Sequence, residues 1–158
     1  MRTASVILTA LILSGCSKPA PPSSEVPAST QEAATLSQQK MCSEQAEKSF
    51  NGSAFSEPKS YPGITNMGNT YTNHFDATAS ICYMEVTTRN VNSRNDFQRY
   101  HLISDAFEGR VYGEFMSFSK DVGPQICSIK PRGQPEITCK SSDEFDGLAL
   151  KYFGTGSD

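Results

Sequence analysis

The two histidines of this chain are the side chains best suited to acid–base chemistry near neutral pH. His74 lies in the polar run 71–76, and Tyr71, His74 and Asp76 together are the candidates for a binding site. A histidine base needs a nucleophile within hydrogen-bond reach, and no residue pattern in the sequence supplies one. We therefore predict no catalytic residue. A hydrolase that uses His74 is the weaker alternative.

The second histidine, His101, comes at the beginning of a β-prone run, and we expect it near one end of a sheet. The two histidines are far apart in the chain, and no Cys-x-x-Cys pair occurs. These spacings match no zinc-binding pattern. The sequence predicts neither a metal site nor a cofactor.

The first fifteen residues have the layout of a secretory signal. Arg2 precedes the apolar run 6–13, and the small residues Ser14 and Gly15 precede Cys16. The apolar run is far shorter than the roughly 20 residues that cross a bilayer. We expect residues 1–15 to be a signal peptide for export.

The residues around the cleavage point, Leu13-Ser14-Gly15-Cys16, resemble the lipobox of bacterial lipoproteins. The resemblance implies that the Cys16 thiol takes a diacylglyceryl group and that the signal is removed before this cysteine. Two or three acyl chains, at ~0.8 kcal/mol per buried methylene, hold a protein stably on a membrane. Because Ser17 is not the aspartate of inner-membrane retention, the outer membrane of the cell envelope is favoured over the inner membrane. An ordinary secreted protein is the alternative.

The chain after Cys16 divides by composition. Residues 16–35 contain four prolines and few core-forming side chains, which is typical of a tether. Residues 36–158 are enough for one modest core, so we expect a single globular domain. The formal net charge is -3 with dispersed basic residues, which argues against nucleic acid as a partner. The expected partners are the membrane, through the lipid on Cys16, and an envelope protein.

Four cysteines follow Cys16, and an even number in an exported chain favours disulfides. The segment 125–140 is symmetric about Gly133, and folding it as a hairpin sets Cys127 opposite Cys139. The same hairpin sets Lys130 opposite Glu136. We therefore predict the disulfide Cys127–Cys139 and, by elimination, Cys42–Cys82.

Helical periodicity appears near both ends of this domain. A helix is predicted over 35–50, and Asn51-Gly52 ends it. A second helix is predicted after Ser141, because Ser141 and Glu144 have the spacing of a capping box, and Gly154 ends this helix. Residues 51–69 hold prolines and glycines and are expected to form a long loop. The apolar face of the first helix is expected to carry Cys42, Ala46 and Phe50. The apolar face of the second is expected to carry Phe145, Leu148, Ala149 and Tyr152.

Three β-hairpins are predicted between the helices, over 70–89, 100–118 and 125–140. Residues 91–97 form a polar connection. In the second hairpin a two-residue turn at Glu108-Gly109 sets Leu102 opposite Phe115 and Ala106 opposite Val111, on the expected core face. The predicted fold class is α+β: an antiparallel sheet of about six strands, a helix at each end, and two disulfides.

Two short motifs resemble small exported bacterial proteins of unassigned function. They are the stretch His74-Phe75-Asp76, followed by Ile81-Cys82-Tyr83, and the later Asp-x-x-Glu-Gly-x-x-Tyr turn over 105–112. Phe75 and Asp76 stand here where those proteins carry tyrosine and asparagine. The resemblance implies an exported single domain and transfers no activity.

The favoured hypothesis for function is a non-catalytic, membrane-anchored binding or interaction module of the cell envelope. The tether and the disulfides support it, because they suggest a rigid domain held near a membrane. The alternative is an inhibitor of an extracytoplasmic hydrolase such as lysozyme, which would enter a cleft with residues 51–69 or 131–135.

Overall fold

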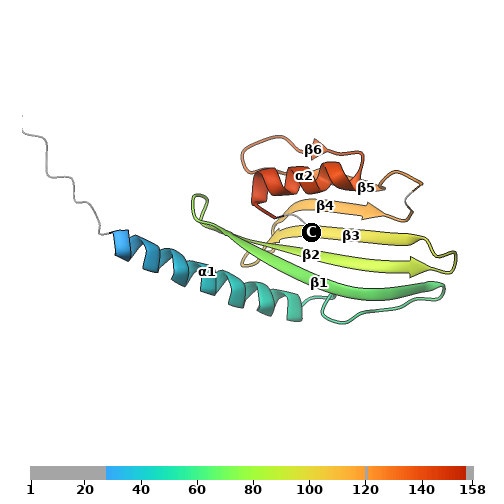
Figure 1. Ribbon diagram of the computed structural model, residues 1–158, viewed down its shortest axis with the longest axis horizontal. Coiled ribbons are helices and arrows are strands. Elements are labelled where there is room, and N and C mark those ends of the chain that lie inside the picture. The colour runs from blue at the N-terminus through green and yellow to red at the C-terminus, as the bar shows by residue number, and fades with distance from the viewer. Residues whose placement is uncertain (1–27, 120, 156–158) are drawn as a thin grey trace, which may run out of the picture.

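The computed structural model describes residues 28–119 and 121–155 (Figure 1). The predicted signal peptide 1–15, Cys16 and residues 17–27 of the predicted tether lie outside the described residues. The helices are α1 (Ala28–Asn51) and α2 (Ser142–Phe153), and the strands are β1 (Ile64–Asp76), β2 (Ile81–Asn92), β3 (Phe97–Asp105), β4 (Val111–Ser117), β5 (Ile126–Ile129) and β6 (Ile137–Thr138). The six strands form one sheet in chain order, and every neighbouring pair is antiparallel. The predicted α+β class is confirmed.

Helix α1 begins at Ala28, earlier than the predicted Thr35. Residues 28–35, assigned above to the tether, lack proline and glycine and contain three alanines, one glutamine and one glutamate, which favour helix. The prolines of the tether all precede this stretch. Among residues 28–119 and 121–155, no helix combines the length and apolarity needed to cross a membrane.

The two helices pack on opposite faces of the sheet. Strand β2 lies between them and is buried on both faces from Ile81 to Thr88, because alternate side chains of a strand point to opposite faces. In Figure 1, α1 lies beside β1 and β2, whereas α2 lies over β4 and β5. The α1 side is built from Cys42, Ala46, Cys82, Met84, Val86 and Ala106, and the α2 side from Ile81, Tyr83, Ile103, Tyr112, Phe115, Ile129, Cys139, Phe145, Ala149 and Phe153.

Both predicted disulfides are present. Cys42–Cys82 joins α1 to β2 with a Cα–Cα distance of 5.3 Å, and Cys127–Cys139 crosses the last hairpin at 5.0 Å. The hairpin also has the predicted register, with Ile129 opposite Ile137. Lys130 Nζ lies 3.7 Å from Glu136 Oε1, as the symmetry about Gly133 predicted.

The predicted register of the second hairpin is wrong by one residue. Phe115 lies opposite His101, and Leu102 lies opposite Glu114. The turn is longer than two residues, because Asp105 Oδ1 accepts the backbone N–H groups of Phe107 and Glu108. A further register shift between Ile103 and Ser104 completes the change. A shift of one residue exchanges the faces of a strand, so Ile103 rather than Leu102 fills the core under α2.

The predicted bounds of the two connecting segments are too wide, whereas those of the C-terminal helix are confirmed. Strand β1 begins at Ile64, so only 52–63 of the expected loop 51–69 remain as a loop, and the polar connection 91–97 shrinks to a turn between Asn92 and Phe97. Helix α2 has the predicted cap, in which Ser141 Oγ accepts the N–H of Glu144. It ends at Gly154 with φ 65°.

Candidate functional site

The structure does not bring the three predicted binding residues together. Tyr71 lies opposite Val86 and stacks on Phe50 of α1, with ring centroids 4.7 Å apart. His74 lies opposite Tyr83, on the other face of the sheet, and its ring lies directly against Gly154.

Asp76, the third predicted residue, closes the β1–β2 turn: its Oδ1 accepts the N–H groups of Thr78 and Ala79. The packing of Tyr71 and His74 and the turn hydrogen bonds of Asp76 give each of the three residues a contact within the fold.

His101 occupies a position that the sequence did not predict. It lies in the middle of β3 rather than near a sheet end, and it is fully buried under α2 between the rings of Phe115 and Phe145. Its Nδ1 is 2.8 Å from Oε1 of the equally buried Glu85. An Arg99 guanidinium nitrogen lies 3.0 Å from its Nε2.

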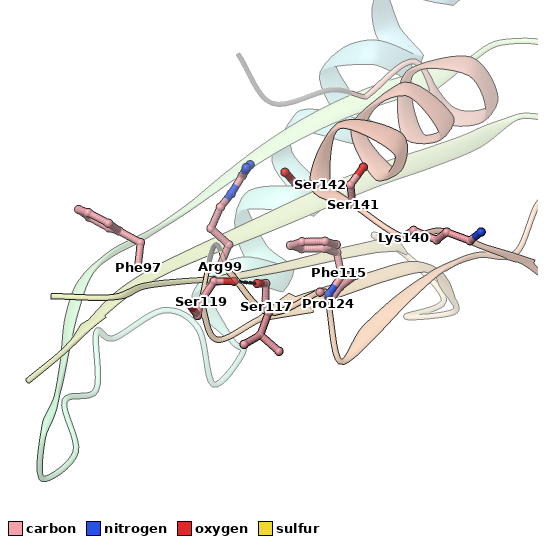
Figure 2. Close-up of a pocket in the computed structure, with 11 residues that line it drawn as sticks. Phe97, Arg99, Phe115, Ser117, Ser119, Pro124, Lys140, Ser141 and Ser142 are labelled. Atoms are coloured by element: carbon pink, nitrogen blue, oxygen red, sulfur yellow. Dashed lines mark hydrogen bonds between the residues drawn. The ribbon is translucent and has the colours of Figure 1, made fainter. Parts of the chain in front are cut away.

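A hollow of about 290 Å³ opens beside Arg99, at the first turn of α2 (Figure 2). We call it the Arg99 pocket. Figure 2 shows the Arg99 side chain rising toward α2 and the Lys140 side chain extending away from it. Arg99 already contacts His101 and Asp146, the latter at 3.9 Å, and Ser117 Oγ donates to the Ser119 carbonyl at 2.8 Å. The Arg99 guanidinium and the Ser117 hydroxyl of this pocket therefore have partners within the fold.

A second hollow, of about 300 Å³, lies on the α1 face of the sheet, and we call it the Thr88 pocket. Its floor is set by strand register: Asn69, Thr88 and Tyr100 form one row across β1, β2 and β3. Asn66 and Asn90 form the next row. The loop 52–63 supplies the wall, with Ala54, Phe55, Glu57, Lys59 and Tyr61.

Two polar side chains on this floor lack a partner. The Thr88 hydroxyl is buried, with Thr88 only 8% exposed, and it makes no hydrogen bond to the described part of the chain. The half-buried amide of Asn90 likewise makes no side-chain hydrogen bond within residues 28–119 and 121–155. An unsatisfied buried hydroxyl costs about 1–3 kcal/mol, so native proteins rarely keep one without a function or a bound water.

The other two asparagines hold the wall in place. Asn69 Nδ2 donates to the Phe55 carbonyl at 2.8 Å, and Asn66 Nδ2 donates to Asn69 Oδ1 at 3.1 Å. The Asn66 backbone N–H donates to Ser60 Oγ at 3.2 Å. These bonds tie the loop 52–63 to β1 and keep the Thr88 pocket open.

Aromatic rings line both sides of the pocket. Phe55 stacks on Tyr100 with centroids 5.7 Å apart, whereas the Tyr61 ring is 62% exposed at the rim. Tyr100 Oη donates to Glu114 Oε1 at 3.2 Å. Burial, and then the charge and hydrogen bond of Glu114, raise the pKa of Tyr100 to about 12, so its hydroxyl stays neutral.

This chain matches no protein-family model, no curated protein and no solved structure. Its function must therefore be inferred from the geometry described above. The sequence reasoning missed the Thr88 pocket because it assigned residues 51–69, which include Asn66 and Asn69 of the floor, to a loop. Two polar residues separate Ile64 from Met67, so no period-two alternation in the sequence could have extended β1 to Ile64.

Proposed function

We propose that this protein is a lipid-anchored, non-catalytic binding module of the bacterial cell envelope and that it holds its ligand in the Thr88 pocket. The observation that carries the proposal is the buried Thr88 hydroxyl, which has no hydrogen-bond partner among residues 28–119 and 121–155 and belongs to a residue that lines the hollow beside Asn90. A ligand that hydrogen-bonds to the Thr88 hydroxyl would remove the cost of burying that group unpaired, and the half-buried Asn90 amide lies near enough to bind the same ligand. Concave sites with a few convergent polar groups are the usual form of small-molecule sites.

The surroundings of both histidines favour binding over catalysis. His101 is enclosed, with one ring nitrogen on Glu85 and the other on Arg99, so neither nitrogen faces solvent. His74 packs its ring against Gly154 and has no hydroxyl or thiol hydrogen-bonded to it among the described residues. A general base needs a substrate proton within reach of a ring nitrogen.

The proposed anchor is the acylated Cys16, and the outer membrane is the favoured site. This part of the proposal rests on the lipobox-like residues 13–16 and the apolar run before them. If α1 continues the tether as a helix of 24 residues, it spans about 36 Å at 1.5 Å per residue. The helix would then act as a spacer between the membrane and the Thr88 pocket.

Site-specific photo-crosslinking in living cells tests the binding role. A photoreactive residue in place of Tyr61 stands at the rim of the Thr88 pocket, and one in place of Phe107, which is 60% exposed outside it, is the matched control. We expect a discrete adduct at Tyr61 and none at Phe107. Equal labelling at both positions, or none at Tyr61, would contradict the proposal. Intact-mass analysis of the same material tests the acylation of Cys16.

A further inference from the structure

The charges around the Thr88 pocket indicate what kind of ligand it fits. All five floor side chains, Asn66, Asn69, Thr88, Asn90 and Tyr100, are uncharged. The rim carries one acidic residue, Glu57, and one basic residue, Lys59, so its formal charge is zero. A pocket for an anion or a cation would carry a complementary charge that is not already balanced. The ligand that fits is therefore neutral and polar.

The hydrogen-bonding groups narrow the class further. A carboxamide offers a donor and an acceptor side by side, and a hydroxyl offers both from one atom. Asn90 and Thr88 are on the same face of β2, two residues apart, and neither group has a partner within the described chain. Adjacent hydroxyls on a ring match this arrangement, because each hydroxyl can donate to one group and accept from the other.

The apolar walls fit the same ligand. A sugar ring has hydroxyls around its edge and C–H groups on its faces, and the C–H groups pack well on aromatic rings. The exposed Tyr61 ring stands at the rim, and the stacked Phe55 and Tyr100 rings lie deeper. The volume of about 300 Å³ is at the lower end of the usual range for small-molecule sites.

We infer that the Thr88 pocket binds a neutral saccharide, with Thr88 and Asn90 hydrogen-bonded to its hydroxyls and Tyr61 packed on a ring face. This inference rests on the proposed binding function and names the ligand class for it. Such a saccharide could come from N-acetylated amino-sugar glycans or from plain glucans. Both sources share ring hydroxyls and an apolar ring face, and the experiment separates them.

The test is calorimetric titration of the full-length chain, purified in a detergent without sugar headgroups, with N-acetylglucosamine trimer and with maltotriose. We expect one of them to bind with a dissociation constant in the millimolar range or tighter. Asn90→Ala and Tyr61→Ala should each weaken that binding about tenfold, which corresponds to about 1.4 kcal/mol. Thr88→Val, which keeps the side-chain shape, should weaken it by a similar factor.

Matched controls separate the pocket from general surface effects. Asn51→Ala removes an exposed asparagine at the end of α1, and Phe107→Ala removes an aromatic ring as exposed as Tyr61. Neither should change the affinity, and circular dichroism checks that every variant is folded. If Asn51→Ala weakens saccharide binding as much as Asn90→Ala does, the inference is overturned.

Failure of the inference differs from failure of the proposed function. If neither trisaccharide binds the folded chain at millimolar concentration, the saccharide inference is wrong. A discrete crosslink at the Tyr61 position would then leave the binding role of the Thr88 pocket standing with another ligand. Loss of both the titration signal and the crosslink would overturn both.

Discussion

His101 Nδ1 lies 2.8 Å from Glu85 Oε1, and both side chains are almost completely buried between the sheet and α2. Arg99 can only donate hydrogen bonds, so His101 Nε2 accepts from it at 3.0 Å and Nδ1 donates to Glu85. The imidazole thus bridges a carboxylate and a guanidinium. Glu85 Oε2 has no partner in the described chain, so this carboxylate depends on His101 for its hydrogen bond.

Removing one member of this pair should be strongly destabilising. His101→Ala leaves the Glu85 carboxylate buried without its donor, and we expect a loss of about 3–5 kcal/mol in the free energy of unfolding. The double variant Glu85→Leu/His101→Leu buries apolar groups instead and should recover most of that loss. Urea denaturation of the three proteins measures both effects. A double variant less stable than His101→Ala would show that the pair contributes net stability.

The disulfide between α1 and β2 should hold the helix on the sheet. Cys42 and Cys82 are separated by 40 residues, and in the chain-entropy model closing that loop contributes about 4 kcal/mol. Cys42→Ala/Cys82→Ala should lower stability by nearly that amount and increase hydrogen exchange in α1 more than in α2. Cys127→Ala/Cys139→Ala is the matched control, for which the shorter ring predicts about 3 kcal/mol and an unchanged α1. Uniform exchange in both helices would contradict the assignment.

The sheet needs glycine at position 113. A Cβ there would lie 2.8 Å from Ile129 Cδ1 and 3.2 Å from Ile103 Cδ1, in the fully buried core. Gly113→Ala should therefore cost about 1–3 kcal/mol by overpacking. Ile129→Val removes the atom in closest contact, so the double variant should lose less stability than the two single losses added together. Strict additivity in thermal or urea unfolding would argue against this contact.

The protein should lose stability in alkali through Tyr83. Its burial, followed by the charges of Tyr112, Asp76 and Asp105, raises its pKa to about 12 against an opposing effect of Arg132. The folded state thus keeps a proton that the unfolded chain loses above its pKa of about 10. The contribution of Tyr83 to the free energy of unfolding is therefore complete below about pH 10. It falls by on the order of 2 kcal/mol in total as the pH rises toward about 12. Urea unfolding of Tyr83→Phe between about pH 9 and about pH 11 should show a smaller decline than the natural chain, whereas equal declines would contradict the assignment.

The sequence predicted best where local chemistry alone determines the structure. The symmetry of 125–140 about Gly133 gave the correct register and the correct disulfide, because a short hairpin has few alternative pairings. Ser141 and Gly154 bound α2 as predicted, since capping depends on neighbouring backbone groups.

The prediction failed where a side chain changed the backbone pairing. Asp105 accepts two N–H groups of its own turn, and this lengthens a turn that Glu108-Gly109 alone would make short. The error exchanged the two faces of β3 and concealed that His101, rather than Leu102, points under α2. Nothing local to His101 indicates that Glu85, on the neighbouring strand, is its partner.

The sequence alone could not predict the Thr88 pocket, for a related reason. Asn66, Thr88 and Tyr100 come from three different strands, and only the register of the whole sheet brings them into one floor. The wall comes from the loop 52–63, whose prolines and glycines carry no periodic signal. Sites assembled from several strands need tertiary information that a single sequence does not hold.

The most direct test of this account follows the side-chain amide signals of an isotope-labelled full-length chain by nuclear magnetic resonance while the saccharide that binds is added. We predict that the amide of Asn90 shifts most, with smaller shifts at Asn66 and Asn69, and that the signals of Asn51 and Asn95 stay in place. Shifts spread over all asparagines, or an Asn90 signal that does not move at saturating saccharide, would contradict the claim that the Thr88 pocket is the ligand site.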